Sequence, residues 1–230
     1  IIPPYRTDVM HPIDIAEDVA IAYGYDKFEP TVPKVPTIAQ PLEKHDRLYA
    51  IKQIMAGIGF QEVICLTLSN AEDEFDRMCA PRKPVAETLN AVTPECDICR
   101  RELMPSLMDV LANNQHYEYP QKIFEAGDVI VLDSTYETGA RNVKKLAAAI
   151  ADTRASYADI ASALASFMES AGVKYDLRPV KHPSFIDGRA AEIVASGRAV
   201  GIIGEISPNV LNNWKMEMPV AVFEVSLEFL

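Results

Sequence analysis

Four prolines within residues 30–41 constrain this chain more than any other feature of its sequence. Proline has no backbone N–H and a fixed φ angle, so this stretch can form neither a helix nor a central strand. A proline-rich segment of this kind behaves as an extended, stiff connector. The sequence therefore predicts a small N-terminal module over residues 1–29, a linker over residues 30–41 and a main domain over residues 42–230.

Composition and charge narrow the class of protein. The 230 residues are 49% hydrophobic and 24% charged, as in ordinary soluble globular proteins with enough chain for a sizeable core. The net charge of −11 argues against direct binding of nucleic acid by this chain, since phosphate contacts need clustered lysine and arginine. There is no apolar run of membrane-spanning length and no signal-peptide pattern. We therefore predict a cytoplasmic protein with no membrane partner, and the missing initial methionine indicates a fragment of a longer polypeptide.

The cysteines do not form the pattern of a zinc site. Cys96 and Cys99 make a single C-x-x-C pair, whereas Cys65 and Cys79 are widely spaced. A structural zinc site usually requires a second ligand pair at short spacing. We predict four reduced thiols, with a zinc or redox role as the alternative.

The N-terminal module contains a cluster of carboxylates at helical spacing. Pro12 is a natural first helical residue, because its missing N–H would be unpaired there anyway. Asp14, Glu17 and Asp18 then fall on one face at i, i+3 and i+4, and Asp8 in the preceding loop can fold back towards them. Oxygen ligands without histidine or cysteine suit Mg²⁺ or Ca²⁺. The alternative is a solvated helix start whose acidic residues complement the helix dipole. On another face of this helix, Ile15, Val19 and Tyr23 can pack inward.

Hydrophobic spacing predicts an α+β main domain. A helix over residues 42–58 precedes a strand over residues 61–68, and Pro105 begins another helix. Residues 143–151 favour a strand, with a helix as the alternative because of their alanine run. A capping-box pattern at Ser156 begins a further helix. Additional strands are predicted over residues 89–93, 122–132, 175–180, 190–195, 199–206 and 220–229. We expect one mainly antiparallel sheet covered by helices.

Several motifs, in matching order, resemble the β subunit family of phenylalanyl-tRNA synthetase. Arg6-x-Asp8-x5-Asp14-x2-Glu17-Asp18 resembles the end of that family's B5-type domain. The motifs that resemble its synthetase-like domain are Arg101-x4-Ser106-Leu107, Phe124-Glu125-x-Gly127-Asp128-Val129, His182-Pro183-Ser184-Phe185-x2-Gly188-Arg189-x-Ala191-Glu192-Ile193 and Gly201-x2-Gly204-Glu205-Ile206-x-Pro208-x-Val210-Leu211. The short form, ending in the Phe223-Glu224-Val225 strand, resembles the archaeal or eukaryotic type.

The resemblance implies a class II aminoacyl-tRNA synthetase-like core over residues 42–230 and the end of a B5-type domain over residues 1–29. It implies a β subunit that assembles with an α subunit into an α2β2 heterotetramer, which joins phenylalanine to tRNA(Phe) using ATP. Catalysis in this family resides in the α subunit, so ATP is used by the holoenzyme and not bound here. Four acidic residues of the family bind a Mg²⁺ shared with the α subunit. They correspond to Asp8, Asp14, Glu17 and Asp18.

The main domain's own residues agree with a catalytically silent role. Adenylate formation needs fixed cations against the ATP phosphates. Residues 100–102 contain two arginines but precede a helix start, and residues 201–205 contain none. His182, with Ser184 and Asp187 nearby, is predicted to be structural, with catalysis as the alternative. We predict no catalytic residue in this chain.

Residues 42–58 and the strand after them also resemble the class II dimerisation element, which predicts a subunit interface there. Two rival functions stay open at this point. One is an active class II-like ligase that works alone. The other is a stand-alone interaction module, or a paralogue with this fold and no role in aminoacylation.

Overall fold

The computed structural model describes residues 1–35, 38–91 and 93–229. Pro36 and Thr37 of the predicted linker and Val92 of a predicted strand lie outside these described residues. The chain divides into two compact units, Ile1–Pro41 and Leu42–Leu230. Each unit is described by itself below.

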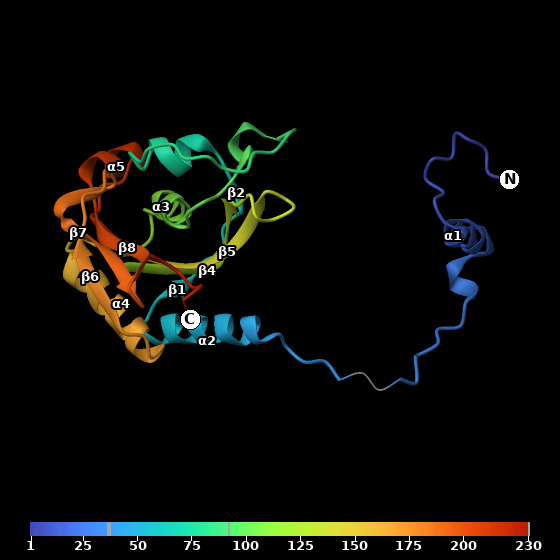
Figure 1. Cartoon of the computed structure of the whole chain (residues 1–230), viewed down its shortest axis with the longest axis horizontal. Helices are drawn as coiled ribbons and strands as arrows, with labels where there is room; N and C mark the ends of the chain where they lie inside the picture. Colours follow the sequence, from blue (N-terminus) through green and yellow to red (C-terminus); the bar gives the residue numbers. More distant parts are fainter. Residues whose placement is uncertain (36–37, 92, 230) are drawn as a thin grey trace. The chain divides into compact units, whose positions relative to one another are not determined.

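The N-terminal unit contains the helix α1 (Pro12–Tyr23) and the 3₁₀ turn η1 (Tyr25–Lys27), drawn in blue in Figure 1. Pro12 is the first helical residue, as predicted. His11 and Asp14 form a reciprocal capping box, in which each side chain accepts backbone N–H groups at the helix start. The start of α1 is therefore determined by residues within one helical turn.

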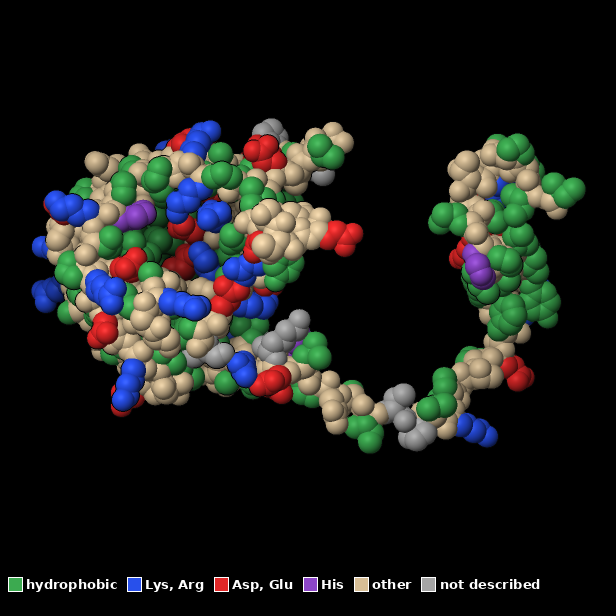
Figure 2. Space-filling view, viewed as in Figure 1, with side chains coloured by type: hydrophobic (Ala, Val, Ile, Leu, Met, Phe, Trp, Pro, Cys, Tyr) green, Lys and Arg blue, Asp and Glu red, His purple; other side chains and the backbone are tan. Residues whose placement is uncertain are grey.

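No residue of α1 is buried within this unit. The prediction that Ile15, Val19 and Tyr23 pack inward is wrong here, because their side chains are 42%, 63% and 54% exposed. Among the described residues, this unit offers α1 a short 3₁₀ turn and a loop but no second helix or sheet, and one helix cannot bury its own apolar face. Figure 2 shows the resulting hydrophobic surface of this unit in green.

The second unit is built on a sheet that has seven strands among the described residues, in the order β1-β4-β5-β9-β8-β7-β6. Neighbouring strands are antiparallel, except that β1 runs parallel to β4. A separate antiparallel pair is formed by β2 and β3. The bounds are β1 Gln61–Glu62, β2 Leu68–Ser69, β3 Ile98–Cys99, β4 Gln121–Leu132, β5 Ala140–Ala151, β6 Tyr175–Pro179, β7 Phe185–Ala195, β8 Arg198–Ile206 and β9 Val220–Ser226. The predicted α+β class with a mainly antiparallel sheet is confirmed.

Helices cover both faces of this sheet. The remaining elements are α2 Glu43–Gly57, the π-helical turn η2 Glu72–Asp76, the 3₁₀ turn η3 Pro94–Cys96, α3 Met104–Asn113, α4 Tyr157–Ser170 and α5 Pro208–Asn213. One hydrophobic core joins α2 and α4 to one face, and a second core joins α3 and α5 to the other. Figure 1 shows α3 inside the curve of the sheet. None of the helices in the described ranges has both the length and the apolarity to cross a lipid bilayer.

The strand β5 confirms the strand prediction for residues 143–151, and the helix alternative is wrong. Ala148 lies opposite Phe124 of β4 and opposite Phe223 of β9. A small side chain fits between two large ones on the same buried face, where all three residues belong to one core. Pairing on both edges satisfies the β5 backbone, and this tertiary context overrides the helix propensity of alanine.

The predicted strand over residues 61–68 is wrong in its middle. Only its two ends pair, as β1 and β2, and they belong to different sheets. The N–H of Val63 donates to the carbonyl of Phe124 at 2.9 Å, and the chain then leaves the sheet edge. Residues 89–91 and 93 form no strand either. Short edge pairings of this kind depend on the neighbouring strand and leave no periodic signal.

Candidate functional site

The four carboxylates predicted to bind a metal lie in the N-terminal unit, where Arg6 brings two of them together. The Arg6 Nη2 atom lies 2.8 Å from Asp8 Oδ2 and 2.8 Å from Asp18 Oδ2. The hydrogen bond from Arg6 holds the pKa of the Asp8 carboxyl below its usual value. Asp8 and Asp18 therefore already share one positive charge.

Asp14 and Glu17 have different surroundings. Asp14 Oδ2 accepts the N–H groups of Met10 and His11 at 2.8 Å and 2.7 Å, so this carboxylate caps α1, whereas Glu17 is exposed. Among the described residues, no group of three or more carboxylate, imidazole or thiol side chains is arranged to hold a metal ion. The all-oxygen donor set fits a hard cation such as Mg²⁺, provided that Asp8 and Asp18 release the Arg6 guanidinium.

On the α3 face of the sheet, Arg100 and Glu125 form a buried ion pair. Arg100 Nη2 lies 2.7 Å from Glu125 Oε1, and the two side chains are only 2% and 4% exposed. Arg100 Nε also donates to the carbonyl of Asp128 at 3.0 Å. Gly127 provides the space, since a Cβ at this position would lie 2.7 Å from Arg100 Nη2. The guanidinium is therefore enclosed by the fold.

Glu224 on β9 attaches the start of α3 to the sheet. Its Oε2 atom accepts the N–H groups of Leu103 and Met104 at 2.9 Å and 2.8 Å, and its Oε1 lies 2.7 Å from Lys145 Nζ. Burial raises the pKa of Glu224, and the charge of Lys145 opposes this rise. This role was not predicted from the sequence. A glutamate among the apolar residues of β9 could have indicated a buried carboxylate.

Glu74 in η2 is a further buried carboxylate beside α3. Its Oε2 atom accepts the N–H groups of Arg101 and Glu102 at 3.1 Å and 3.3 Å, while no hydrogen-bond partner for Oε1 lies among the described residues. Burial raises the pKa of Glu74 to about 8, so the neutral form predominates at neutral pH.

We expect Glu74→Gln to stabilise the chain increasingly, relative to the wild type, as the pH rises from about 5 to 8. The pKa of Glu74 is about 8 when folded and near 4.5 when unfolded, so in this window the folded state binds the extra proton. The stability of the wild type therefore falls as the pH rises, and glutamine removes that loss. Urea unfolding at steps across the window measures the difference in free energy of unfolding. A difference that stays constant with pH would contradict the assignment.

A cavity of about 240 Å³ opens on this face of the sheet beside α3. Lys145 lies 2.7 Å from Glu224, and Lys83 lies 3.4 Å from Glu102, so both lining lysines face carboxylates. The volume is below the roughly 300–1,000 Å³ of typical small-molecule sites. Adenylate chemistry needs cations directed at the ATP phosphates, whereas the cations here are already paired.

His182, Ser184 and Asp187 do not form a catalytic array. The Ser184 hydroxyl donates to the carbonyl of Met78 at 2.5 Å, and Asp187 pairs with Lys181 at 3.2 Å. His182 Nδ1 accepts the N–H of Ser184 at 3.3 Å, and burial lowers the pKa of this imidazole. The structural role of His182 stays a prediction.

An aliphatic stripe is exposed between β1 and β2. We give this name to Ile64, Leu66 and Leu68, whose side chains are 85%, 73% and 41% exposed. The helix α2 packs against the adjoining β1, and its Tyr49 is also exposed. A cluster of large exposed apolar side chains marks an interaction surface on a folded domain. The stripe lies within the element predicted to form a subunit interface.

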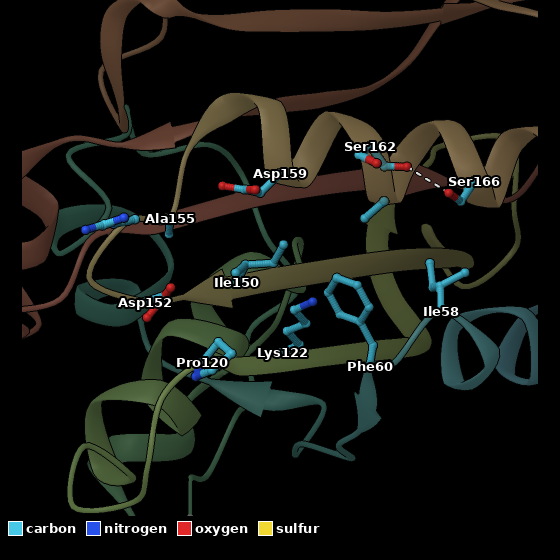
Figure 3. A pocket seen from close by; sticks show the side chains of 12 residues that line it. Ile58, Phe60, Pro120, Lys122, Ile150, Asp152, Ala155, Asp159, Ser162 and Ser166 are labelled. Atoms are coloured by element: carbon cyan, nitrogen blue, oxygen red, sulfur yellow. Dashed lines mark hydrogen bonds between the residues drawn. The ribbon is translucent and has the colours of Figure 1, made fainter.

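A cavity of about 400 Å³ lies between α4 and the strands β4 and β5. Figure 3 shows its lining side chains, with Phe60 and Ile150 near the centre. Its two basic lining residues are balanced by Asp152 and Asp159. Asp159 is committed to the α4 capping box, where it accepts the N–H of Ser156 at 3.0 Å. With balanced charges, this cavity does not indicate a particular ligand.

A comparison with solved structures identifies the class to which this arrangement belongs. The structure of Desulfitobacterium hafniense PylSc, a pyrrolysyl tRNA synthetase, matches with a TM-score of 0.65 at 15% sequence identity. The match covers 81% of this chain and 67% of that chain. The second unit therefore has the fold of a class II aminoacyl-tRNA synthetase, which confirms the predicted fold.

Sequence comparisons identify the family. The family described as phenylalanyl tRNA synthetase beta chain CLM domain matches residues 28–227, and the tRNA synthetase B5 domain matches residues 1–25. The phenylalanine–tRNA ligase β subunits of Thermococcus sibiricus and Methanocaldococcus jannaschii are 43% and 42% identical over 98% and 99% of this chain. The chain belongs to the phenylalanyl-tRNA synthetase β chain family. It spans 40% and 41% of the length of these two relatives, and the match does not favour a stand-alone module.

Proposed function

We propose that this chain is the part of a phenylalanine–tRNA ligase β subunit that holds the catalytic α subunit. In the proposed α2β2 assembly, the holoenzyme joins phenylalanine to tRNA(Phe) with ATP in the cytoplasm. The observation that carries the proposal is the aliphatic stripe beside α2, with Ile64 85% exposed. A folded domain with such a surface gains free energy when a partner covers it.

Co-expression of the full-length β subunit with the α subunit of the same organism tests this proposal. We expect light scattering to give the mass of two α and two β subunits. We also expect the amides of residues 61–69 to exchange hydrogen more slowly in the complex than in the free β subunit, because the partner covers them. Equal exchange of this segment in both states would contradict the proposed interface.

We further propose that adenylate forms on the α subunit and not on this domain. The pairing of Arg100 with Glu125 and of Lys145 with Glu224 supports the proposal, because each removes a cation from the α3 face of the sheet.

ATP–pyrophosphate exchange measures adenylate formation and therefore tests this proposal. We expect exchange in the α2β2 complex and none above background with this chain alone. Lys83→Met removes a cation from the 240 Å³ cavity and is expected to leave exchange by the complex unchanged, as is the exposed control Lys181→Met. A fall of about tenfold or more for Lys83→Met alone, with the tetramer intact, would show that the cavity takes part in the reaction.

We propose that Asp8, Asp14, Glu17 and Asp18 provide oxygen ligands for a Mg²⁺ shared with the α subunit. The exposure of Glu17 and the way in which Asp8 and Asp18 already face one cation support this proposal. When bound, the ion would neutralise the carboxylates and connect the two subunits.

Glu17→Gln in the full-length complex tests the metal proposal. Glu17 suits the test because it is exposed, whereas Asp14 also caps α1. We expect less Mg²⁺ per purified complex by elemental analysis and easier dissociation in a chelator, because one anionic ligand is lost. The exposed Glu29→Gln is the control for a change of charge alone. Unchanged metal content and unchanged assembly would refute the assignment.

A further inference from the structure

A cavity of about 880 Å³ adjoins the aliphatic stripe, and Ile64, Leu66 and Leu68 all line it. Its charged lining is strongly acidic. The charged residues are Glu72, Asp73, Glu95, Asp97, Asp109 and one basic residue, Arg77. The cavity therefore combines exposed apolar side chains with a negatively charged lining, which is suited to a cation on an apolar stem.

The single basic lining residue, Arg77, already pairs with neighbouring side chains. Arg77 Nη1 lies 3.0 Å from Asp73 Oδ1, Arg77 Nε lies 3.2 Å from Glu72 Oε1, and the guanidinium stacks over the ring of Trp214 at 5.0 Å. Asp109, in the part of α3 that lines the cavity, has a different environment. It accepts a hydrogen bond from the Asn113 amide at 2.9 Å, and within the described residues it forms no ion pair.

The environment of Asp109 raises the pKa of its carboxyl. Partial burial is the larger cause, and the charge of Asp73 is the second. An added cation near Asp109 would relieve the repulsion between the two carboxylates.

Trp214 supplies a second and independent observation. It lines the same cavity and is only 4% exposed, yet its Nε1–H has no hydrogen-bond partner among the described residues. A buried indole N–H normally donates to an acceptor, and leaving it unpaired costs about 1–3 kcal/mol. One residue of the cavity lining therefore carries a buried donor with no acceptor among the described residues.

We propose that the cavity receives a lysine or arginine side chain of the partner subunit, whose charge pairs with Asp109 while a carbonyl of the same segment accepts the Trp214 N–H. This inference rests on the proposed function, because it assigns the occupant to the partner that covers the aliphatic stripe. Two arguments select this occupant: the negative lining complements a basic side chain, and the cavity is continuous with the stripe. A basic side chain entering past Ile64 would bury its methylene stem there.

The experiment measures the affinity of the full-length β subunit for the α subunit over a series of salt concentrations. We expect Asp109→Asn to raise the Kd about tenfold and to flatten its dependence on salt, because one charge pair is lost. Asp109→Lys should raise the Kd further, since the introduced cation repels the incoming one. Asp176→Asn on the exposed edge strand β6 is the matched control and should leave both quantities unchanged.

Trp214→Phe keeps an aromatic ring and removes only the N–H donor. We expect the Kd to rise about three- to tenfold with an unchanged salt dependence, because no charge is altered. Circular dichroism verifies that each variant is folded. An Asp109→Lys variant that is folded and binds with the wild-type Kd and salt dependence would overturn this inference and leave the proposed function intact. A wild-type β subunit that binds no α subunit would instead overturn the proposed function itself.

Discussion

Glutamate at both Ile64 and Leu66 is expected to weaken binding of the α subunit by ~100-fold or more. The two wild-type side chains are 85% and 73% exposed in this chain, so they offer apolar area that a partner can bury. Each glutamate would instead place a charge in the interface and require its desolvation. Titration of labelled α subunit with the full-length β variant measures the Kd.

The fold of the variant should be preserved, because substitutions at exposed positions usually change stability by less than about 0.5 kcal/mol. Leu89→Glu is the matched control, since Leu89 is likewise an exposed aliphatic residue but lies outside the stripe. We expect this control to bind the α subunit like the wild type. Equal weakening by Leu89→Glu would indicate a general effect of added charge, and normal binding by the double variant would exclude the stripe as the interface.

Arg100→Met is expected to lower the free energy of unfolding by about 3–5 kcal/mol, which is the usual cost of leaving one member of a buried ion pair without its partner. Glu125 would remain 4% exposed beside an apolar side chain. The Asp128 carbonyl would also lose the hydrogen bond from Arg100. Urea unfolding of the 230-residue chain, followed by circular dichroism, measures the change.

A double variant distinguishes the loss of the pair from the loss of volume. Arg100→Met combined with Glu125→Gln removes both charges, so we expect it to be more stable than Arg100→Met alone. Arg198→Met, at an exposed position of β8, is the control and should change stability little. If the double variant were no more stable than Arg100→Met, charge pairing would not explain the stability of this site.

Helix starts were predictable because the groups that set them are close in sequence. Pro12 marks the first residue of α1, and Ser156 forms the predicted capping box with Asp159. Both signals act within four residues and need no tertiary partner. The apolar face of α1 shows the limit of this reasoning, since periodicity indicates which residues can pack and not what they pack against.

The candidate metal site was predictable in part. Helical spacing correctly places Asp14 within the first turn of α1, with Glu17 and Asp18 one turn further on. The spacing did not reveal that Arg6 joins Asp8 to Asp18, because Arg6 and Asp18 are separated by 12 residues. The choice of partner for a carboxylate depends on how the loop folds back over the helix.

The sequence by itself determined the family, the α+β class and the places where most helices begin, because motifs and caps depend on residues that are near in the chain. Only the tertiary structure decided that Glu224 is buried beneath α3 and that Ile64 is exposed. Glu224 bonds to Leu103 across 121 residues, and Arg100 pairs with Glu125 across 25. Contacts between residues so far apart in the chain leave no periodic pattern in the sequence. The burial of Glu224, the pairing of Arg100 and the exposure of Ile64 therefore depend on how the strands are arranged in the sheet.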